Sequence, residues 1–221
     1  MRVILFGATG MIGQGVLREC LLDADVEAVL AVGRSATGQK HDKLREIIHA
    51  DLFDLSPIEE QLAGYDACFF CLGVSSAGMS EADYRRVTYD LALAVGRTLA
   101  KKNPSMTFVF VSGAGTNAKG RSMWARVKGE TENALLELPF KGAYMFRPGG
   151  ILPMHGIKSR TRLYRVVYAI MGPLYPLWKA LFPNALTTSE RMGQAMLAVA
   201  KRGAPQPILE TKDINAVTST A

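Results

Sequence analysis

The chain is poor in the residues on which several classes of protein depend. Its 221 residues include three cysteines, three histidines and two tryptophans. Three cysteines cannot all pair with one another, so they indicate a reduced, intracellular setting, and we expect a cytoplasmic protein. Cys68 and Cys71 have the Cys-x-x-Cys spacing, but on a strand they point to opposite faces. We therefore expect neither a redox dithiol nor a metal site.

Long apolar runs are lacking as well. The first apolar stretch is too short for a secretory signal, and a glycine-rich turn interrupts it. The best candidate for a membrane span, residues 163–182, contains an arginine, a lysine, a glycine and two prolines. We therefore expect no transmembrane segment.

The basic excess of the chain lies in its last third. Residues 1–150 carry 17 Lys and Arg against 17 Asp and Glu, whereas residues 151–221 carry nine against three. Such an excess suits an anionic partner, or it simply keeps the protein soluble. Because no base-stacking motif or recognition-helix pattern accompanies it, we expect no nucleic-acid binding.

A glycine-rich turn follows the apolar run at residues 3–6 and precedes a helical pattern. Gly7 lets the chain leave the strand sharply, Gly10 lets the backbone approach a pyrophosphate, and Gly13 lets the helix pack close to the strand. The anion would then lie at the helix N-terminus, where free N–H groups and the macrodipole offset its charge. The predicted cofactor contacts of this turn are Gly7, Thr9, Gly10, Met11, Ile12 and Gly13.

Short apolar runs alternate with helical patterns along the first 150 residues. The predicted strands are residues 3–6, 28–32, 46–49, 67–72, 108–111 and 143–146. The predicted helices are residues 11–22, 80–102 and 122–138, with a weaker one at 56–62. This alternation predicts an α/β fold with a doubly wound parallel sheet of the Rossmann type, and a dinucleotide-binding core over residues 1–150.

The strand pattern fades from Gly149 onward, and apolar helical pieces are punctuated by Pro148, Pro153, Pro173, Pro176 and Pro183. We expect residues 151–221 to form a small C-terminal helical cap on the substrate side of the same domain, with a polar tail that frays after Lys212. Lys158, Arg162 and Arg165 recur at helical spacing. That helix packs on the sheet, or its basic face contacts an acyl substrate, an anionic lipid surface or a protein partner. Residues 188–202 are predicted as a further helix.

The residues about 20 positions past the glycine turn determine whether NAD(H) or NADP(H) binds better. An NAD-selective site has an acidic residue there, whereas this chain has Arg34 and Ser35. Since both can bind a phosphate, we expect NADP(H) to be preferred over NAD(H). The alternative is that Arg34 is an ordinary solvated charge.

Two further segments follow predicted strands and complete the adenosine side. Asp51 could accept from the adenine amino group or cap a turn. The residues assigned to this side are Asp51, Leu52, Leu72, Gly73 and Val74.

Ser112 follows the fifth predicted strand, and Trp124 and Lys128 lie four residues apart on the helix that comes next. With the glycine-rich turn and Arg147-Pro148-Gly149, these residues resemble the short-chain dehydrogenase/reductase superfamily, in particular its atypical, Tat-interacting-protein-like branch. The resemblance covers residues 1–150 well and the remainder loosely. The segments shared with that branch resemble Cys71-Leu72-Gly73, Val127-Lys128-Gly129-Glu130 and Phe146-Arg147-Pro148-Gly149.

The resemblance implies that Ser112 and Lys128 are catalytic, with Trp124 at the position of the usual tyrosine. It also implies that Lys128 holds the nicotinamide ribose and that Pro148 and Gly149 lie beside the nicotinamide. An indole N–H can donate a hydrogen bond but cannot release its proton at physiological pH.

Three interpretations remain open. Ser112 polarises an apolar or acyl carbonyl while Lys128, or a water that it holds, delivers the proton, which makes the protein an oxidoreductase. Alternatively the fold serves as a non-catalytic, NADP(H)-dependent redox sensor or protein-interaction module. In the third interpretation Tyr84 or Tyr89 supplies a phenol. Both a monomer and a homodimer are compatible with the sequence.

Overall fold

The computed structural model describes residues 1–157 and 185–218. Its main sheet has seven parallel strands in the order β3-β2-β1-β4-β5-β6-β9. The central strands β4 and β5 are buried along their whole length, as their continuous apolar sequences require. The strands are β1 (Arg2–Phe6), β2 (Ala28–Gly33), β3 (Leu44–Ile48), β4 (Ala67–Phe70), β5 (Thr107–Val111), β6 (Gly142–Arg147) and β9 (Ile208–Glu210). The predicted doubly wound α/β architecture is confirmed.

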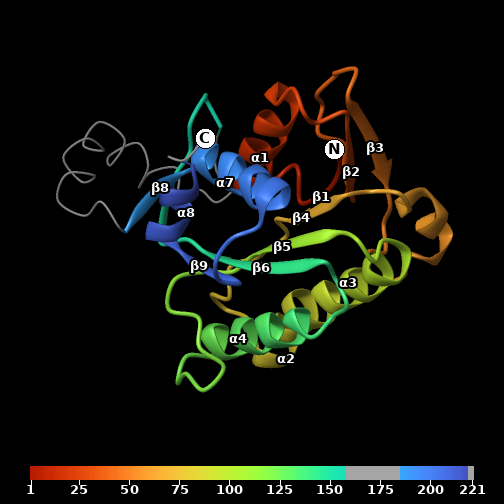
Figure 1. The fold of residues 1–221 in the computed structure, drawn as a ribbon. Helices are drawn as coiled ribbons and strands as arrows, with labels where there is room; N and C mark the ends of the chain where they lie inside the picture. The colour runs from red at the N-terminus through yellow and green to blue at the C-terminus, as the bar shows by residue number, and fades with distance from the viewer. Residues whose placement is uncertain (158–184, 219–221) are drawn as a thin grey trace.

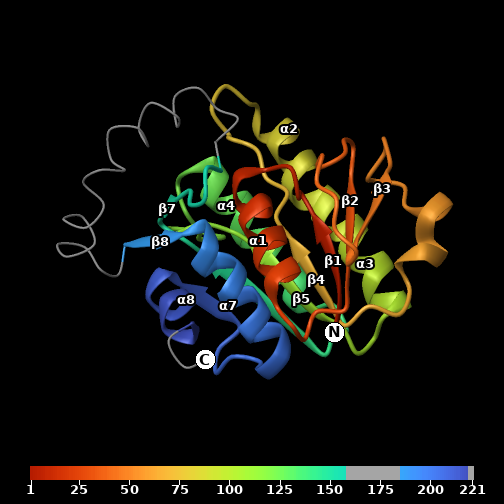
Figure 2. The ribbon, with the colours of Figure 1, turned by 90° about the horizontal axis from the view of Figure 1, so that it is seen from above.

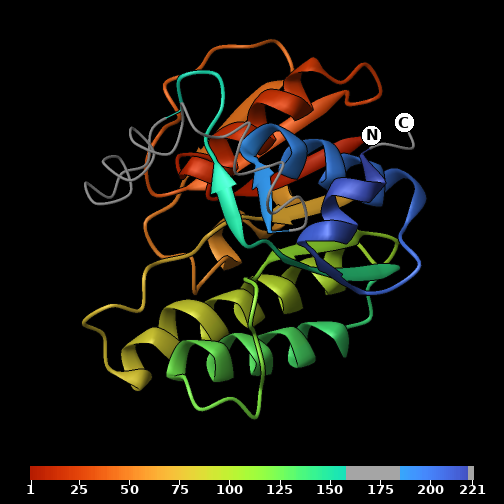
Figure 3. The same cartoon turned by 90° about the vertical axis from the view of Figure 1, so that its left-hand side faces the viewer.

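Helices cover both faces of this sheet (Figure 1). One layer consists of α1 (Met11–Leu22), α7 (Ser189–Arg202) and α8 (Thr211–Val217). The opposite layer consists of α2 (Glu81–Arg85), the π-helical segment η2 (Arg86–Asp90), α3 (Leu91–Lys102) and α4 (Met123–Leu136). A 3-10 helix, η1 (Ser56–Leu62), packs its apolar side chains into the core beneath this second layer. Figure 3 shows the two layers from the side, with the red and blue helices above the sheet and the olive and green ones below.

The long helix predicted over residues 80–102 is divided. Ser80 begins it as expected, because its side chain accepts a hydrogen bond from the Asp83 N–H. The π-helical turn η2 then separates α2 from α3. In a π-helical turn each backbone hydrogen bond spans one residue more than in an α-helix, which changes the direction of the side chains that follow. Such turns are frequent near functional sites.

The C-terminal part differs most from the sequence prediction. The strand pattern does not end at residue 149, because β9 pairs with β6 in the main sheet, and β7 (Gly150–Leu152) pairs with β8 (Leu186–Thr188). We expected the tail to fray after Lys212, and this is wrong for the residues up to Val217, which are helical. Residues 211–217 form α8, which begins with a reciprocal capping box between Glu210 and Asp213. The predicted basic face of Lys158, Arg162 and Arg165 lies outside the described residues.

Helices α1 and α7 cross at two glycines and lie side by side (Figure 2). A Cβ atom on Gly15 would lie 2.6 Å from the Ser189 backbone oxygen, and one on Gly193 would lie 2.7 Å from the Glu19 Cγ. The backbones can approach this closely only because both positions lack a side chain. Met192, Ala195 and Met196 of α7 are therefore part of the core that covers the sheet, and they join the same hydrophobic cluster as α1.

We predict that Gly15→Ala destabilises the protein. The gain in helix propensity is at most about 1 kcal/mol, whereas the added methyl group meets rigid backbone, so we expect a net loss of roughly 1 kcal/mol or more. Gly33→Ala is the matched control, because its Cβ would have Ser35 O as nearest neighbour at 3.9 Å. Urea unfolding of both variants measures the difference, and equal midpoints would refute the close helix contact.

Candidate functional site

The glycine-rich turn lies where the strand order of the sheet reverses. After β1 the chain proceeds to β2 and β3 on one side, and it then returns to β4 on the other. Ligands of doubly wound folds bind outside the carboxyl ends of the strands at such a switch point. Gly7 has a φ of +82°, and its Cβ would lie 2.7 to 2.8 Å from the backbone of Cys71 and Leu72. The turn after β1 and the segment after β4 are therefore in direct backbone contact.

Gly13 brings α1 against this turn. A Cβ atom there would lie 2.0 Å from the Gly7 carbonyl oxygen, so only glycine fits. The helix N-cap, Gly10, makes no side-chain capping bond, and the first turn contains no acidic residue. This helix end therefore offers backbone N–H groups to an external anion, in a cradle that any side chain would fill. The arrangement fits a dinucleotide pyrophosphate.

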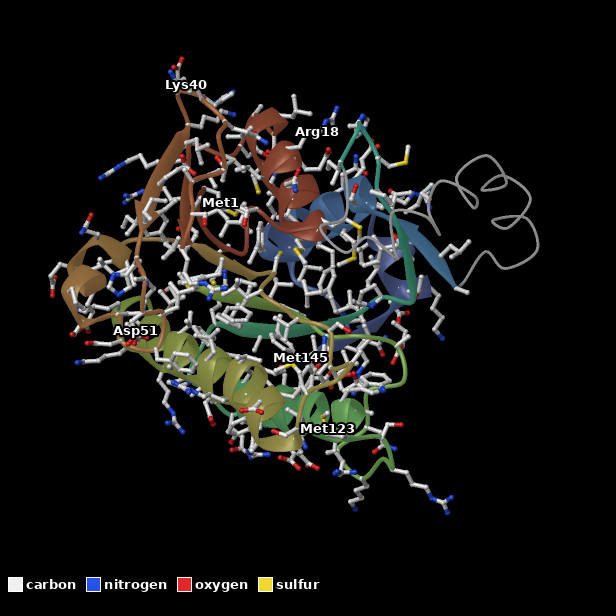
Figure 4. The ribbon with its side chains drawn as sticks, turned by 180° about the vertical axis from the view of Figure 1, so that it is seen from behind. Met1, Arg18, Lys40, Asp51, Met123 and Met145 are labelled. Carbon is white, nitrogen blue, oxygen red and sulfur yellow. The ribbon has the colours of Figure 1, made fainter. Side chains whose placement is uncertain are left out.

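The residues predicted to bind adenosine phosphate and ribose follow β2. Arg34 and Ser35 come directly after Gly33, and both are exposed. Neither residue has a hydrogen-bonding or ionic partner within residues 1–157 and 185–218. Figure 4 shows Lys40 farther along, at the outer end of the connection to β3. Their side chains are thus available to a ligand at the carboxyl end of β2.

The other predicted adenosine contacts differ in exposure. Asp51, labelled in Figure 4, accepts a hydrogen bond from the Phe53 N–H at 2.9 Å, which is the turn-capping geometry. Leu52 is buried in the core below η1. Leu72 is partly buried, whereas Gly73 and Val74 are exposed at the end of β4.

The cysteines next to this site have unreactive surroundings. Cys68 is fully buried in β4, and Cys71 packs against the core. Desolvation raises the pKa of both thiols above the ordinary cysteine value.

Ser112 directly follows β5 and is buried. Its Oγ lies 3.0 Å from the Thr116 Oγ1, and the Thr116 hydroxyl donates to the Gly113 carbonyl oxygen at 2.7 Å. The Ser112 hydroxyl is therefore the donor of the first bond. Thr116 is a site residue that the sequence reasoning missed, although its spacing of four residues from Ser112 places it in the same loop.

Lys128 projects from α4 toward the end of β5. Its Nζ donates to the carbonyl oxygen of Ser112 at 2.9 Å and more weakly to that of Val111 at 3.4 Å. The structure thus brings together the two polar residues that the family resemblance paired. Burial lowers the pKa of Lys128 to about 8, and the nearby Glu132 carboxylate partly opposes this effect.

Trp124 lies one helical turn before Lys128, just after Met123 at the start of α4 (Figure 4). A Cβ atom added to Gly113 or Gly115 would lie 4.0 or 3.6 Å from its indole ring. The ring therefore covers the loop that follows Ser112.

The two tyrosines considered as alternative acids are engaged elsewhere. Tyr84 is 2% exposed, and burial raises its pKa, which moves the phenol away from the range of a useful acid catalyst. The Tyr89 ring lies under the Arg85 guanidinium, 4.3 Å from the carbon to the ring centroid.

The segment after β6 is tied to both of its neighbours. The Pro148 carbonyl oxygen accepts from the Ala114 N–H at 2.9 Å, and the Gly149 N–H donates to the Thr211 Oγ1 at 2.8 Å. The preceding residue, Arg147, forms two bonds through its Nε to the buried Glu132 carboxylate, at 3.0 and 3.2 Å. Glu132 is the second residue of the region that sequence reasoning missed.

These observations define the class of the protein: a Rossmann α/β domain with a glycine-rich turn at its topological switch point. The chain belongs to the NAD(P)H-binding family, whose family model matches residues 7–137. The expectation of a nicotinamide dinucleotide cofactor is thereby confirmed.

Curated relatives support this assignment. Protein FMP52-2, mitochondrial, of Scheffersomyces stipitis is 29% identical over 98% of this chain and 96% of its own length. Protein HTATIP2 of Rattus norvegicus is 28% identical over 69% of this chain and 62% of its own length. The family match and these relatives confirm the predicted resemblance to the atypical short-chain dehydrogenase/reductase superfamily.

Solved structures share the fold. The UDP-glucose 4-epimerase structure has a TM-score of 0.69 at 16% identity and covers 98% of this chain and 80% of its own. The structure of the Bordetella bronchiseptica enzyme WbmF, in complex with NAD+, has a TM-score of 0.68 at 14% identity. The match covers 99% of this chain and 76% of WbmF.

The expectation of a cytoplasmic protein is wrong by these comparisons. Relatives named FMP52 carry the word mitochondrial in their names. The expectation rested on cysteine content, which does not distinguish one intracellular compartment from another. None of the helices in the described parts of the chain has both the length and the hydrophobicity to cross a bilayer.

We predict that Arg147→Met destabilises the protein strongly. The Glu132 side chain is 1% exposed, and the substitution leaves its carboxylate buried without its cationic partner, which costs about 3–5 kcal/mol. The control is Arg85→Met, which removes the partner of the partly exposed Glu130 and should cost about 1 kcal/mol. Chemical unfolding compares the two, and equal losses would contradict the buried pair.

Proposed function

We propose that the protein is an NADP(H)-dependent oxidoreductase that reduces the carbonyl group of an apolar or acyl substrate. Lys128 is its proton donor, and Ser112 is the hydrogen-bond donor to the carbonyl oxygen. The observation that carries this proposal is the position of the Lys128 ammonium at the carboxyl end of β5, in contact with Ser112 and with a lowered pKa.

The chemistry divides between the cofactor and the chain. NADPH, when bound, supplies the hydride to the carbonyl carbon. A proton must then reach the carbonyl oxygen, and an ammonium with a pKa of about 8 can release one near neutral pH. Ser112 must turn its hydroxyl from Thr116 toward the substrate, which replaces one hydrogen bond by another.

The proposed roles of the other residues follow their places in the fold. Residues 1–150 hold the cofactor through the turn at Gly7 to Gly13 and through the ends of β2, β3, β4 and β6. Residues 151–221 frame the substrate side, where Gly149 is bonded to Thr211. A peripheral contact with an anionic membrane surface would involve the basic residues of the same part of the chain.

The preference for NADP(H) is supported by the end of β2. Arg34 and Ser35 are exposed there, and residues 33–36 contain no carboxylate that would repel the adenosine 2′-phosphate. A guanidinium binds a phosphate through charge-assisted hydrogen bonds, which strengthens the complex with the phosphorylated cofactor alone.

A non-catalytic, NADP(H)-responsive binding module is the second candidate. It is favoured by Trp124, which occupies the position of the usual acid and covers the loop after Ser112. The two candidates differ in whether Lys128 controls turnover.

We predict that the reductive rate depends on the charge of Lys128. The ammonium form dominates below its pKa of about 8, so kcat/KM for carbonyl reduction should fall as the pH rises through about 8. Lys128→Arg keeps the charge but cannot give up the proton, so the rate should drop by about 10²-fold or more. Lys119→Arg, at an exposed lysine, is the control. Nucleotide binding without turnover of any carbonyl compound would favour the non-catalytic module.

We predict that Arg34→Ala weakens NADPH binding but not NADH binding. Loss of a charge-assisted bond to phosphate should raise the Kd for NADPH roughly 10- to 100-fold. Arg45→Ala, at an exposed arginine on β3, should leave both constants unchanged. Calorimetric titration with each cofactor measures the constants. Equal affinity of the unmodified protein for NADPH and NADH would remove Arg34 from this role.

A further inference from the structure

Three charged side chains from separate elements connect the C-terminal strand to the neighbourhood of Lys128. Glu132 lies one helical turn after Lys128 on α4, so the two side chains share a helix face. Both Glu132 oxygens accept from Arg147 on β6. The Arg147 Nη1 also donates to the Glu210 Oε1 on β9, at 3.2 Å. The Glu132–Arg147–Glu210 network thus ends one helical turn from Lys128, the proposed proton donor.

No hydrogen bond links Lys128 to a carboxylate within the described ranges. Its Nζ donates to two backbone carbonyls, and it lies 5.9 Å from the centroid of the Phe110 ring on β5. Glu132 is therefore the anion that acts on Lys128, through space and across one turn of helix. Its influence depends on how completely Arg147 neutralises it.

The charged groups on the other elements packed against α4 are engaged or exposed. Arg85 on α2 pairs with Glu130, which lies two residues from Lys128 and so on a different face of the helix. Tyr84 on α2 is bonded to Thr88 on η2. Arg86 and Asp90 on η2 and Arg97 on α3 are exposed. From β6 the charged group is Arg147, which is paired with Glu132.

Two opposing effects then determine the charge of Lys128. Loss of hydration favours the neutral amine, whereas the Glu132 carboxylate favours the ammonium. Arg147 weakens the second effect by pairing with Glu132.

We propose that Glu132 is the positioning residue of Lys128: its carboxylate, held in place by Arg147 and Glu210, keeps the ammonium protonated until the substrate oxygen requires the proton. The inference rests on the proposed function, in which Lys128 is the proton donor. It concerns the proton affinity of that lysine, which can be measured without turnover.

The test is the titration of Lys128 in the full-length, cofactor-free protein. Lysines are labelled with ¹³C at Cε, and the Lys128 signal is assigned by its absence in Lys128→Arg. In Glu132→Gln the midpoint of this signal should fall by roughly one pH unit, because the attractive charge is removed and Arg147 keeps only the Glu210 carboxylate as an ionic partner. Glu130→Gln, two residues away and partly exposed, is the matched control and should leave the midpoint in place.

A purely structural role for Glu132 would lower stability without moving this midpoint. If Glu132→Gln does not fold, the double variant Glu132→Gln with Arg147→Met carries the same expectation with a smaller shift, because it leaves no buried charge unpaired. An unchanged midpoint in the folded variant would overturn the inference, even in a protein that reduces carbonyls. A lowered midpoint supports it, even in a protein that shows no turnover, in which case the proposed oxidoreductase function alone would fail.

Discussion

The close backbone contact among three segments is the constraint on which the rest of the structure depends. Gly7 meets the segment after β4, and Gly13 meets the Gly7 carbonyl oxygen. Each contact leaves no room for a β-carbon. Together they hold the N-terminus of α1 above the point where the strand order reverses, so its N–H groups and its dipole face the same space as the ends of β4 and β5. A helix end with free backbone N–H groups and a partly buried lysine are thereby positioned by one sheet.

The sequence predicted the first 150 residues well because parallel strands buried on both faces are continuous apolar runs, and the runs at β4 and β5 are of that kind. After residue 149 it predicted the helix over residues 188–202, which is α7, but it missed the strands because they are short. Strands β7, β8 and β9 have three residues each, too few for a period to appear. Their place in the fold depends on pairing with β6 and with one another, which is tertiary information.

In the candidate site, too, the residues in local motifs were predicted and those that depend on tertiary packing were missed. Ser112 and Lys128 were predicted because each belongs to a local motif, and the structure joins them by a hydrogen bond. Glu132 was missed because a glutamate on a helix is usually solvated, and only its partner Arg147, from another element, explains its burial. Nothing in the sequence near Glu132 indicates that partner, since the pair forms only when α4 packs on β6.

The charge of Lys128 matters because position 124 holds a tryptophan in place of a tyrosine. In a site with a tyrosine there, the lysine lowers the pKa of a phenol and need not itself lose a proton. An indole has no such proton, so in the proposed reaction the lysine must act as the acid, and its charge must be held within reach of neutral pH. Burial alone would drive the amine toward its neutral form. The Glu132 carboxylate raises the pKa of Lys128 and so favours the ammonium. The size of this effect depends on Arg147 and, through Arg147, on the C-terminal strand β9. A strand of three residues at the edge of the sheet is therefore coupled to the proton affinity of Lys128.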